Sequence, residues 1–237
     1  IANPDCGYSF LCKTSDFNKI PGTPIAYWVS GKLRSLFGCE YLSNIAETRL
    51  GMATADNDRF LRLWFEVETT NTHLNATSRI EAQGSNKTWF PYQKGGDLRK
   101  WYGNYDYLVN WLNDGYDVRN FSDFNTGRIR SHNYNLEYIF QPGVTWNALA
   151  ANNTAARILD NALFDNAGSS LFTKQVDRYL ILAYINSNLL TPLIQTISST
   201  LNYQPGEMGK LPALYKFLNV NNVISNSPSL VNISKND

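Results

Sequence analysis

The spacing of apolar residues predicts a helix near each end of this chain. Residues 25–37 carry apolar residues at spacings of three and four, as in an amphipathic helix that Gly38 would end; they are Ile25, Trp28, Val29, Leu33, Leu36 and Phe37. Residues 175–199 show a second run of helical period, interrupted at Pro192. The segment after residue 218 is polar, and we expect a frayed tail there.

Between these helices the pattern changes to short runs of β-branched and aromatic residues. Such runs are typical of strands, and they lie at residues 49–60, 62–67, 89–92, 107–111, 141–146, 162–164 and 169–172. Asp56-Asn57-Asp58 and Asn113-Asp114-Gly115 are turn signals between them. The chain is therefore predicted to have an α+β fold, with a twisted, mostly antiparallel sheet that carries loops and is braced by two or more helices.

The composition indicates a folded globular protein. Of 237 residues, 43% are hydrophobic and 17% are charged, which is enough to bury a core without disulfides. The net charge of +1 argues against a protein that coats DNA nonspecifically, so a nucleic-acid role has to be local or shared. The longest apolar stretch is too short to span a bilayer, and no signal peptide is evident.

The cysteines and histidines do not form a metal site. Cys6, Cys12 and Cys39 are odd in number and lie near one end, as expected for reduced thiols in the cytoplasm. His73 and His132 are far from each other and from any cysteine pair, so neither is expected to bind zinc.

Motifs for catalysis are also missing from the sequence. There is no Gly-x-Gly-x-x-Gly run after a strand, no Gly-Lys-Ser loop and no Gly-x-Ser-x-Gly elbow. The carboxylate pairs Asp56/Asp58 and Asp114/Asp117 are better explained by turn hydrogen bonds than by a hydrolytic centre. The chain itself is therefore expected to recognise a ligand rather than to react with one.

Two segments combine cations with planar side chains, as DNA-contacting loops do. Residues 94–104 carry two lysines, Arg99, Trp101, Tyr102 and several glycines. Residues 119–134 carry three arginines against the single acid Asp123. The alternative for the first segment is a turn and strand with a buried tryptophan, and for the second a solvated strand pair.

The candidates for DNA contact are cations, amides and aromatic rings in these loops and in the turn at residue 57. They are Asn57, Arg59, Lys94, Arg99, Lys100, Trp101, Tyr102, Asn104, Arg119, Arg128, Arg130, Asn133 and Tyr134.

Four separated blocks of sequence resemble one protein family. Residues 23–30, 51–64 and 94–104, together with Leu201-Asn202-Tyr203-Gln204-Pro205-Gly206, are similar in order and content to the PglX family, the adenine-specific DNA methyltransferases of type 1 BREX phage-defence systems. The resemblance covers nearly the whole chain. It implies that the chain corresponds to the target recognition domain that follows the methyltransferase half in that family.

The resemblance implies three segments and a role for each. Residues 1–24 would link to the methyltransferase half, residues 25–218 would be the recognition domain, and residues 219–237 the tail. The family's catalytic motif is of the Asn-Pro-Pro-Tyr type, and Asn3-Pro4-Asp5 departs from it at Asp5. No catalytic residue is therefore carried over, and S-adenosylmethionine would be bound by the intact enzyme and not by this chain.

The partners implied by the resemblance are double-stranded DNA and the chain's own methyltransferase domain. Other BREX proteins, or a phage inhibitor that mimics DNA, are further possibilities, and no membrane is expected. Two alternatives stay open, which are a partner-binding module of a defence complex and the specificity module of a restriction-modification enzyme.

Overall fold

A computed structural model describes residues 13–148, 154–198, 200, 202–217 and 220–236. The expectations for Cys6, Cys12, Asn3-Pro4-Asp5 and the first half of the linker lie outside these residues. The only described cysteine, Cys39, is a half-buried free thiol.

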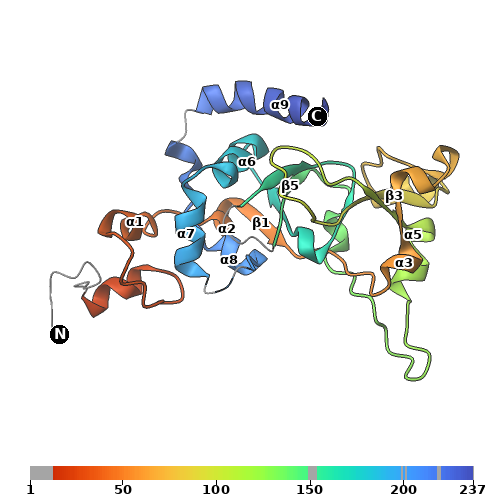
Figure 1. The fold of residues 1–237 in the computed structure, drawn as a ribbon, viewed down its shortest axis with the longest axis horizontal. Coiled ribbons are helices and arrows are strands. Elements are labelled where there is room, and N and C mark those ends of the chain that lie inside the picture. Colours follow the sequence, from red (N-terminus) through yellow and green to blue (C-terminus); the bar gives the residue numbers. More distant parts are fainter. Residues whose placement is uncertain (1–12, 149–153, 199, 201, 218–219, 237) are drawn as a thin grey trace.

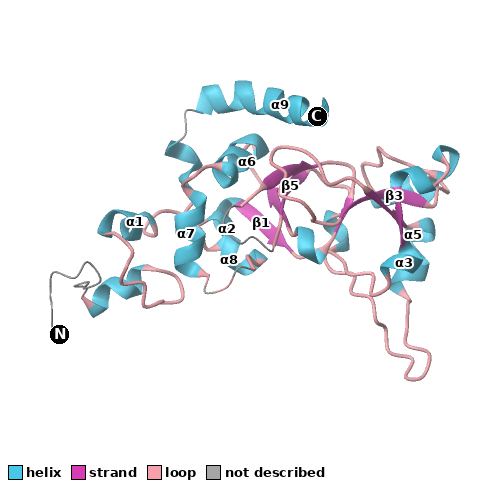
Figure 2. Ribbon diagram, viewed as in Figure 1, coloured by secondary structure: helices cyan, strands magenta, loops and turns pink. Residues whose placement is uncertain are grey.

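The strands form two four-stranded sheets, which Figure 2 shows as two neighbouring groups. The first sheet has the order β1 (Ala46–Arg49), β8 (Ser170–Thr173), β5 (Gly143–Trp146) and β6 (Ala156–Leu159), and all its pairs are antiparallel. The second has the order β2 (Leu61–Leu63), β4 (Tyr107–Asn110), β3 (Trp89–Gln93) and β7 (Leu163–Phe164), and only β3 and β7 run parallel. The predicted α+β class is confirmed, but the strands are divided between two sheets.

The helices cover the two sheets unequally (Figure 1). Around the first sheet lie α1 (Gly31–Leu36), α2 (Leu42–Ile45), α6 (Arg178–Asn186), α7 (Leu190–Ile197), α8 (Pro205–Gly209) and α9 (Val220–Asn236). Near the second sheet lie the shorter α3 (Asn57–Phe60), α4 (Arg79–Gly84) and α5 (Leu112–Arg119). The first sheet is therefore the more thoroughly enclosed of the two.

Each sheet has its own hydrophobic core. Val144, Trp146 and Ile158 of the first sheet pack with the apolar residues of α6 and α7. Phe90 and Val109 belong to the second core, which lies under the second sheet. Burial of large apolar side chains is the main stabilising term in both, at about 1.5–3 kcal/mol for each.

The two cores meet where the chain passes from β7 to β8. The rings of Phe164 and Phe172 lie 5.5 Å apart, and both belong to the second core. Gly51 runs so close to this junction that a Cβ atom would lie 2.1 Å from the carbonyl oxygen of Phe164. Glycine is required there because no side chain fits.

The first predicted helix is much shorter than residues 25–37. It begins at Gly31, where the Ser30 side chain accepts a hydrogen bond of 3.2 Å from the Leu33 backbone N–H. A serine in this geometry is a strong helix start. Ile25 and Trp28 are therefore outside the helix, and they are 72% and 56% exposed rather than part of an apolar face.

The second predicted helix is two helices, α6 and α7, with an 80° bend between them. The break lies before α7, at Ser187, whose backbone is extended, and not at Pro192. Pro192 lies in the first turn of α7, where a missing N–H leaves no hydrogen bond unmade. No single helix of the described residues is long and apolar enough to cross a membrane.

Two predicted turns also form helix starts instead of hairpins. Asp56 caps α3, because its carboxylate accepts a hydrogen bond of 3.1 Å from the Arg59 N–H. Asn113, Asp114 and Gly115 take left-handed backbone angles inside the first half of α5. The strand predicted at residues 62–67 ends at Leu63, because Glu66 accepts the Leu63 N–H at 2.6 Å and closes a 3-10 turn (Trp64–Glu66).

The polar end of the chain is helical, in contrast to the frayed tail expected from its composition. Helix α9 runs beside α6 (Figure 1). Ser227 and Val231 are buried in this contact. A short apolar face is enough to stabilise a helix once a partner surface is present. The average polarity of the segment, on which the prediction of a frayed tail was based, does not show such a face.

Candidate nucleic-acid interface

The candidate residues fall into two separate places. One is the hairpin surface, which we define as the segment 121–134 together with α3. The other is the loop 94–104. In Figure 1 the hairpin projects from the α3 and α5 end of the molecule, whereas the loop follows β3 and lies toward α6 and α9.

The hairpin is held by a small set of hydrogen bonds. The Arg130 N–H donates to the Phe121 carbonyl and the Asp123 N–H to the Arg128 carbonyl, both at 2.8 Å. At the tip, the Asp123 carboxylate accepts from the N–H groups of Asn125 and Thr126 at 3.1 and 2.9 Å. These bonds, that from the Thr126 backbone first, lower the pKa of the Asp123 carboxyl. The exposed tip therefore has a defined shape.

The base of the hairpin brings α3 and the segment 121–134 together. The guanidinium groups of Arg59 and Arg130 lie 5.1 and 5.6 Å from the ring centre of Phe121. Ala53 and His132 exchange backbone hydrogen bonds of 2.8 and 2.9 Å. Two cations that are 71 positions apart in sequence thus share one aromatic support.

The cations of the hairpin surface are available to an anionic ligand. Arg59, Arg128 and Arg130 are exposed, and none of them forms an ion pair with a carboxylate among the described residues. An open depression of about 500 Å³ lies beside them, lined by Asp123, Thr126, Arg128, Ile129, Arg130, His132 and Ala55. Asp123 is the one acid that lines this depression, and because its lowered pKa keeps it charged, the depression is cationic only because Arg128 and Arg130 outnumber it.

The remaining candidates of this region differ in availability. Asn57 is exposed and accepts a hydrogen bond of 2.7 Å from the Thr54 hydroxyl. Tyr134 is exposed and stacks on His132 at 5.5 Å. Asn133 donates to Ser131 at 3.0 Å, and its Oδ1 is buried without a hydrogen-bond partner. Arg119 is different, because it is paired with Asp114 at 2.6 Å.

Asp114 explains why Arg119 is not free. Its carboxylate also accepts from Arg79 Nε at 2.9 Å, and its carbonyl accepts from Arg119 at 3.1 Å. The hydrogen bond from Asp114 is the main reason that the pKa of Arg79 is raised. The pairing ties α4 to α5, so Arg119 holds the base of the hairpin instead of facing solvent as a separate charge.

The loop 94–104 is fixed by buried polar groups beneath it. Arg157 of β6 is fully buried and donates to the Arg99 carbonyl at 3.1 Å and to the Asn147 amide oxygen at 2.6 Å. Asn147 in turn donates to the Gly96 carbonyl at 2.7 Å. Burial lowers the pKa of Arg157 to about 10. The Gln93 side chain also holds the loop, because it donates a hydrogen bond of 2.8 Å to the Gly103 carbonyl.

Most side chains of this loop are used within the protein. Asn104 is 4% exposed and donates to the Asp97 carbonyl at 3.0 Å, in a left-handed conformation. Trp101 packs against the first core, and its backbone pairs with Ala156 and Ile158 of β6. The alternative stated for this segment was a turn and strand with a buried tryptophan; Trp101 is half-buried and pairs with β6 through its backbone.

The other candidates of the loop are only partly free. Lys100 donates to the Asn186 carbonyl at 3.1 Å, and Arg99 has an exposed side chain. Tyr102 stacks on Tyr105 at 5.2 Å and is covered on one side by Lys235, 4.9 Å from its ring. Lys94 lies 4.8 Å from the Tyr107 ring, beside an open cavity that Asn57 also lines, so it is closer to the hairpin surface than its sequence neighbours are.

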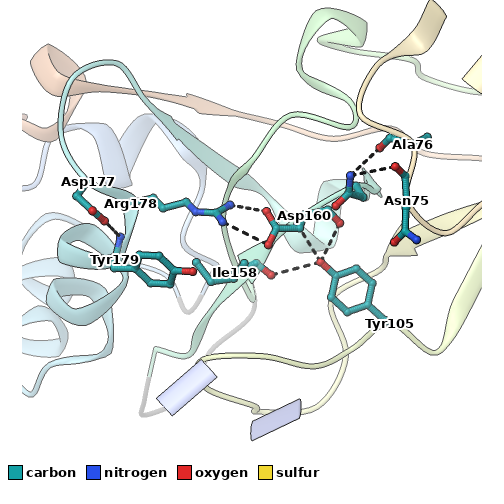
Figure 3. A network of polar contacts seen from close by, with 9 residues as sticks. Asn75, Ala76, Tyr105, Ile158, Asp160, Asp177, Arg178 and Tyr179 are labelled. Atoms are coloured by element: carbon teal, nitrogen blue, oxygen red, sulfur yellow. Dashed lines mark hydrogen bonds and ion pairs between the residues drawn. The ribbon is translucent and has the colours of Figure 1, made fainter. Parts of the chain in front are cut away.

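A polar network ties the loop region to the rest of the molecule (Figure 3). The Tyr105 hydroxyl donates to the carbonyls of Ile158 and Asp160, and the Asp160 carboxylate is paired with Arg178 of α6. Asn161 donates to the Ala76 carbonyl at 3.0 Å. Because every group in it is engaged, this network serves to join the two sheets.

Sequence reasoning overlooked two features of these places. Arg157 is an arginine in the middle of a wholly buried strand, and no alternation of polar and apolar residues marks it. Phe124 is 100% exposed at the hairpin tip. Its position inside a turn sequence, where aromatic residues are unusual, could have indicated this exposure. No group of three or more described histidines, cysteines or carboxylates is placed to hold a metal ion.

Comparison with known proteins agrees with the resemblance seen in the sequence. No family model matches the chain. It is 38% identical over its whole length to 20% of the adenine-specific methyltransferase PglX of Lacticaseibacillus casei (strain Zhang). Over 84% of its length it is 35% identical to 16% of the adenine-specific methyltransferase BrxX of Escherichia coli O9:H4 (strain HS). The chain therefore belongs to the family of the proteins named PglX and BrxX, and it spans a fifth or less of their length.

Proposed function

We propose that this chain contacts duplex DNA for an adenine-specific DNA methyltransferase of the BREX phage-defence type. The observation that carries the proposal is the match of the whole chain to proteins named adenine-specific methyltransferases, combined with a projecting surface of unpaired arginines. Adenine methylation requires a grip on DNA around the target base, because that base has to leave the stack at a cost of a few kcal/mol.

In this proposal the hairpin surface makes the main contact. Arg59, Arg128 and Arg130 would neutralise phosphates, and Asn57, Asn133 and Tyr134, which belong to the same hairpin surface, would face base edges or sugars. Arg99 and Lys100 of the loop 94–104 would add a second contact along the duplex. S-adenosylmethionine and the methyl-transfer residues would lie in a part of the protein outside this chain.

The test compares the two places in the full-length methyltransferase that contains this chain. The double variant Arg128→Ala/Arg130→Ala should bind duplex DNA more weakly, and the slope of log affinity against log salt should fall by about one to two units. Fluorescence anisotropy at several salt concentrations measures both quantities. The double variant Arg99→Ala/Lys100→Ala should have a smaller effect, since Lys100 is engaged with Asn186.

A matched control removes charge elsewhere on the same chain. Lys32 of α1 and Lys210, which follows α8, are exposed, and in Figure 1 both helices lie to the left of β1, away from the projecting hairpin. Lys32→Ala/Lys210→Ala should leave the slope unchanged. Equal slopes for the hairpin variant and this control would contradict the proposal for the hairpin surface.

The same variants separate the alternatives. A partner-binding module would lose association with a protein while DNA binding stays intact. A specificity module of a restriction-modification enzyme would direct DNA cleavage, which sequencing of methylated genomic sites and a cleavage assay on unmodified DNA distinguish from methylation alone.

A further inference from the structure

Phe124 is the most exposed large apolar side chain described in this protein. It is 100% exposed, at the tip of the hairpin. Several other exposed rings have a ring neighbour: Trp64 and Phe65 meet edge to face at 5.6 Å, and Tyr134 stacks on His132. No ring contact is formed by Phe124 within the described part of the chain. A side chain held in this way gives nothing to the fold of the chain.

The backbone that carries Phe124 is preset. Its neighbour Asp123 accepts three hydrogen bonds, two from backbone N–H groups and one from the Thr126 hydroxyl at 3.0 Å. The Gly127 N–H donates to the Asp123 carbonyl at 2.8 Å, and Gly127 takes the left-handed φ of 67° that closes the tip. Because the tip is already ordered, presenting the ring to a ligand costs little further conformational entropy.

The surroundings of the ring indicate an anionic ligand with flat apolar faces. Arg128 and Arg130 follow it on the returning side of the hairpin, both exposed, and Ile129 between them is 45% exposed. Duplex DNA has this combination, with phosphates outside and stacked bases inside. Proteins that bend or open DNA often place an apolar wedge next to arginines that hold the backbone.

We propose that Phe124 inserts into the base stack of duplex DNA beside the adenine that is to be methylated. The inference rests on the proposed function and extends it, because it gives the hairpin a role in opening the duplex as well as in binding it. Stacking of an aromatic ring on a base is worth about 1–3 kcal/mol, which offsets part of the cost of unstacking the adenine.

The experiment uses the full-length methyltransferase with Phe124→Ala and, as the conservative variant, Phe124→Trp. The DNA is a duplex containing the mapped methylation site, with 2-aminopurine in place of the target adenine. Insertion predicts that 2-aminopurine fluorescence rises when the unmodified enzyme or the Trp variant binds. The rise should be lost with Phe124→Ala. Phe217→Ala, which removes another exposed phenylalanine, should behave as the unmodified enzyme.

A second substrate distinguishes insertion from simple loss of binding. On a duplex whose target adenine is mismatched, the base is already partly unstacked. The kcat/KM of Phe124→Ala on this duplex should therefore be within about threefold of that of the unmodified enzyme. On the fully paired duplex the same variant should be about 5- to 150-fold slower in kcat/KM, the factor that corresponds to the stacking energy. An equal loss on both substrates, or no loss on either, would overturn the insertion.

The failure of this inference and the failure of the proposed function give different results. If the hairpin does not contact DNA at all, Arg128→Ala/Arg130→Ala leaves binding to both duplexes unchanged. If the hairpin binds DNA without inserting Phe124, the arginine variant weakens binding to both duplexes, while Phe124→Ala gives the same fluorescence rise as the unmodified enzyme.

Discussion

The loop 94–104 and the hairpin surface have similar compositions but opposite relations to the fold. Both carry cations, glycines and aromatic rings. In the loop, Trp101 and Asn104 are directed into the protein, and Arg157 and Asn147 bind the backbone from below. In the hairpin, the side chains face solvent, and the few hydrogen bonds present serve the turn itself. A residue composition suited to DNA therefore does not distinguish a contact surface from a structural loop.

The largest difference between the two regions should appear at alkaline pH. Burial raises the pKa of Tyr92, Tyr105 and Tyr184 above the ordinary 10.0, and Tyr105 anchors the loop region. Their pKa is higher in the folded than in the unfolded chain, so their contribution to stability is complete below pH 10 and is lost as the pH rises further. Arg157 has a lowered pKa in the folded chain, so its contribution to stability rises with pH where that of the tyrosines falls. It is one group against three, and the net stability should therefore fall.

This difference can be followed by tyrosine absorbance near 295 nm during a pH titration. The buried tyrosines Tyr92, Tyr105 and Tyr184 should ionise only above pH 10 and together with unfolding, which circular dichroism detects. A single transition for all tyrosines, with the fold intact, would show that the loop region is not held by buried hydroxyls.

A smaller effect is expected from Arg157→Ala. The substitution leaves a cavity under the loop and removes the donor for Arg99 and Asn147, so the free energy of unfolding should fall by about 3 kcal/mol. Arg128→Ala in the hairpin should change it by less than about 0.5 kcal/mol, because nothing is buried there. Urea unfolding of both variants measures the contrast. Similar losses would mean that the hairpin is as integral to the fold as the loop.

The smallest effect is expected from Asp123→Ala. Loss of the three hydrogen bonds to its carboxylate should make the tip open more often locally, and the global stability should be unchanged. Amide hydrogen exchange at Asn125 and Thr126 reports this opening. Faster exchange that extends to β6 would show that the tip and the loop region are coupled.

Several elements followed from the sequence because local physics determines them. The strands at β3, β4 and β5 were predicted from short aromatic and β-branched runs, and the start of α3 lies at the Asp56-Asn57-Asp58 signal, although as a helix cap. The resemblance to the PglX family was confirmed by the comparisons. What failed were boundaries, such as residues 25–37, where the capping Ser30 outweighed an apolar pattern, and two whole elements, β6 and α9, which were not predicted.

The sequence by itself determined the fold class, most strand positions and the family, because periodicity, turn residues and similarity are properties of the chain order. Only the tertiary structure decided which cations face solvent, since that depends on partners distant in sequence. Asp114 removes Arg119 from the free charges, and Arg157 pulls the loop 94–104 onto the first sheet. Phe121 gathers Arg59 and Arg130 at the base of the hairpin, and the exposed ring of Phe124 lies at its tip.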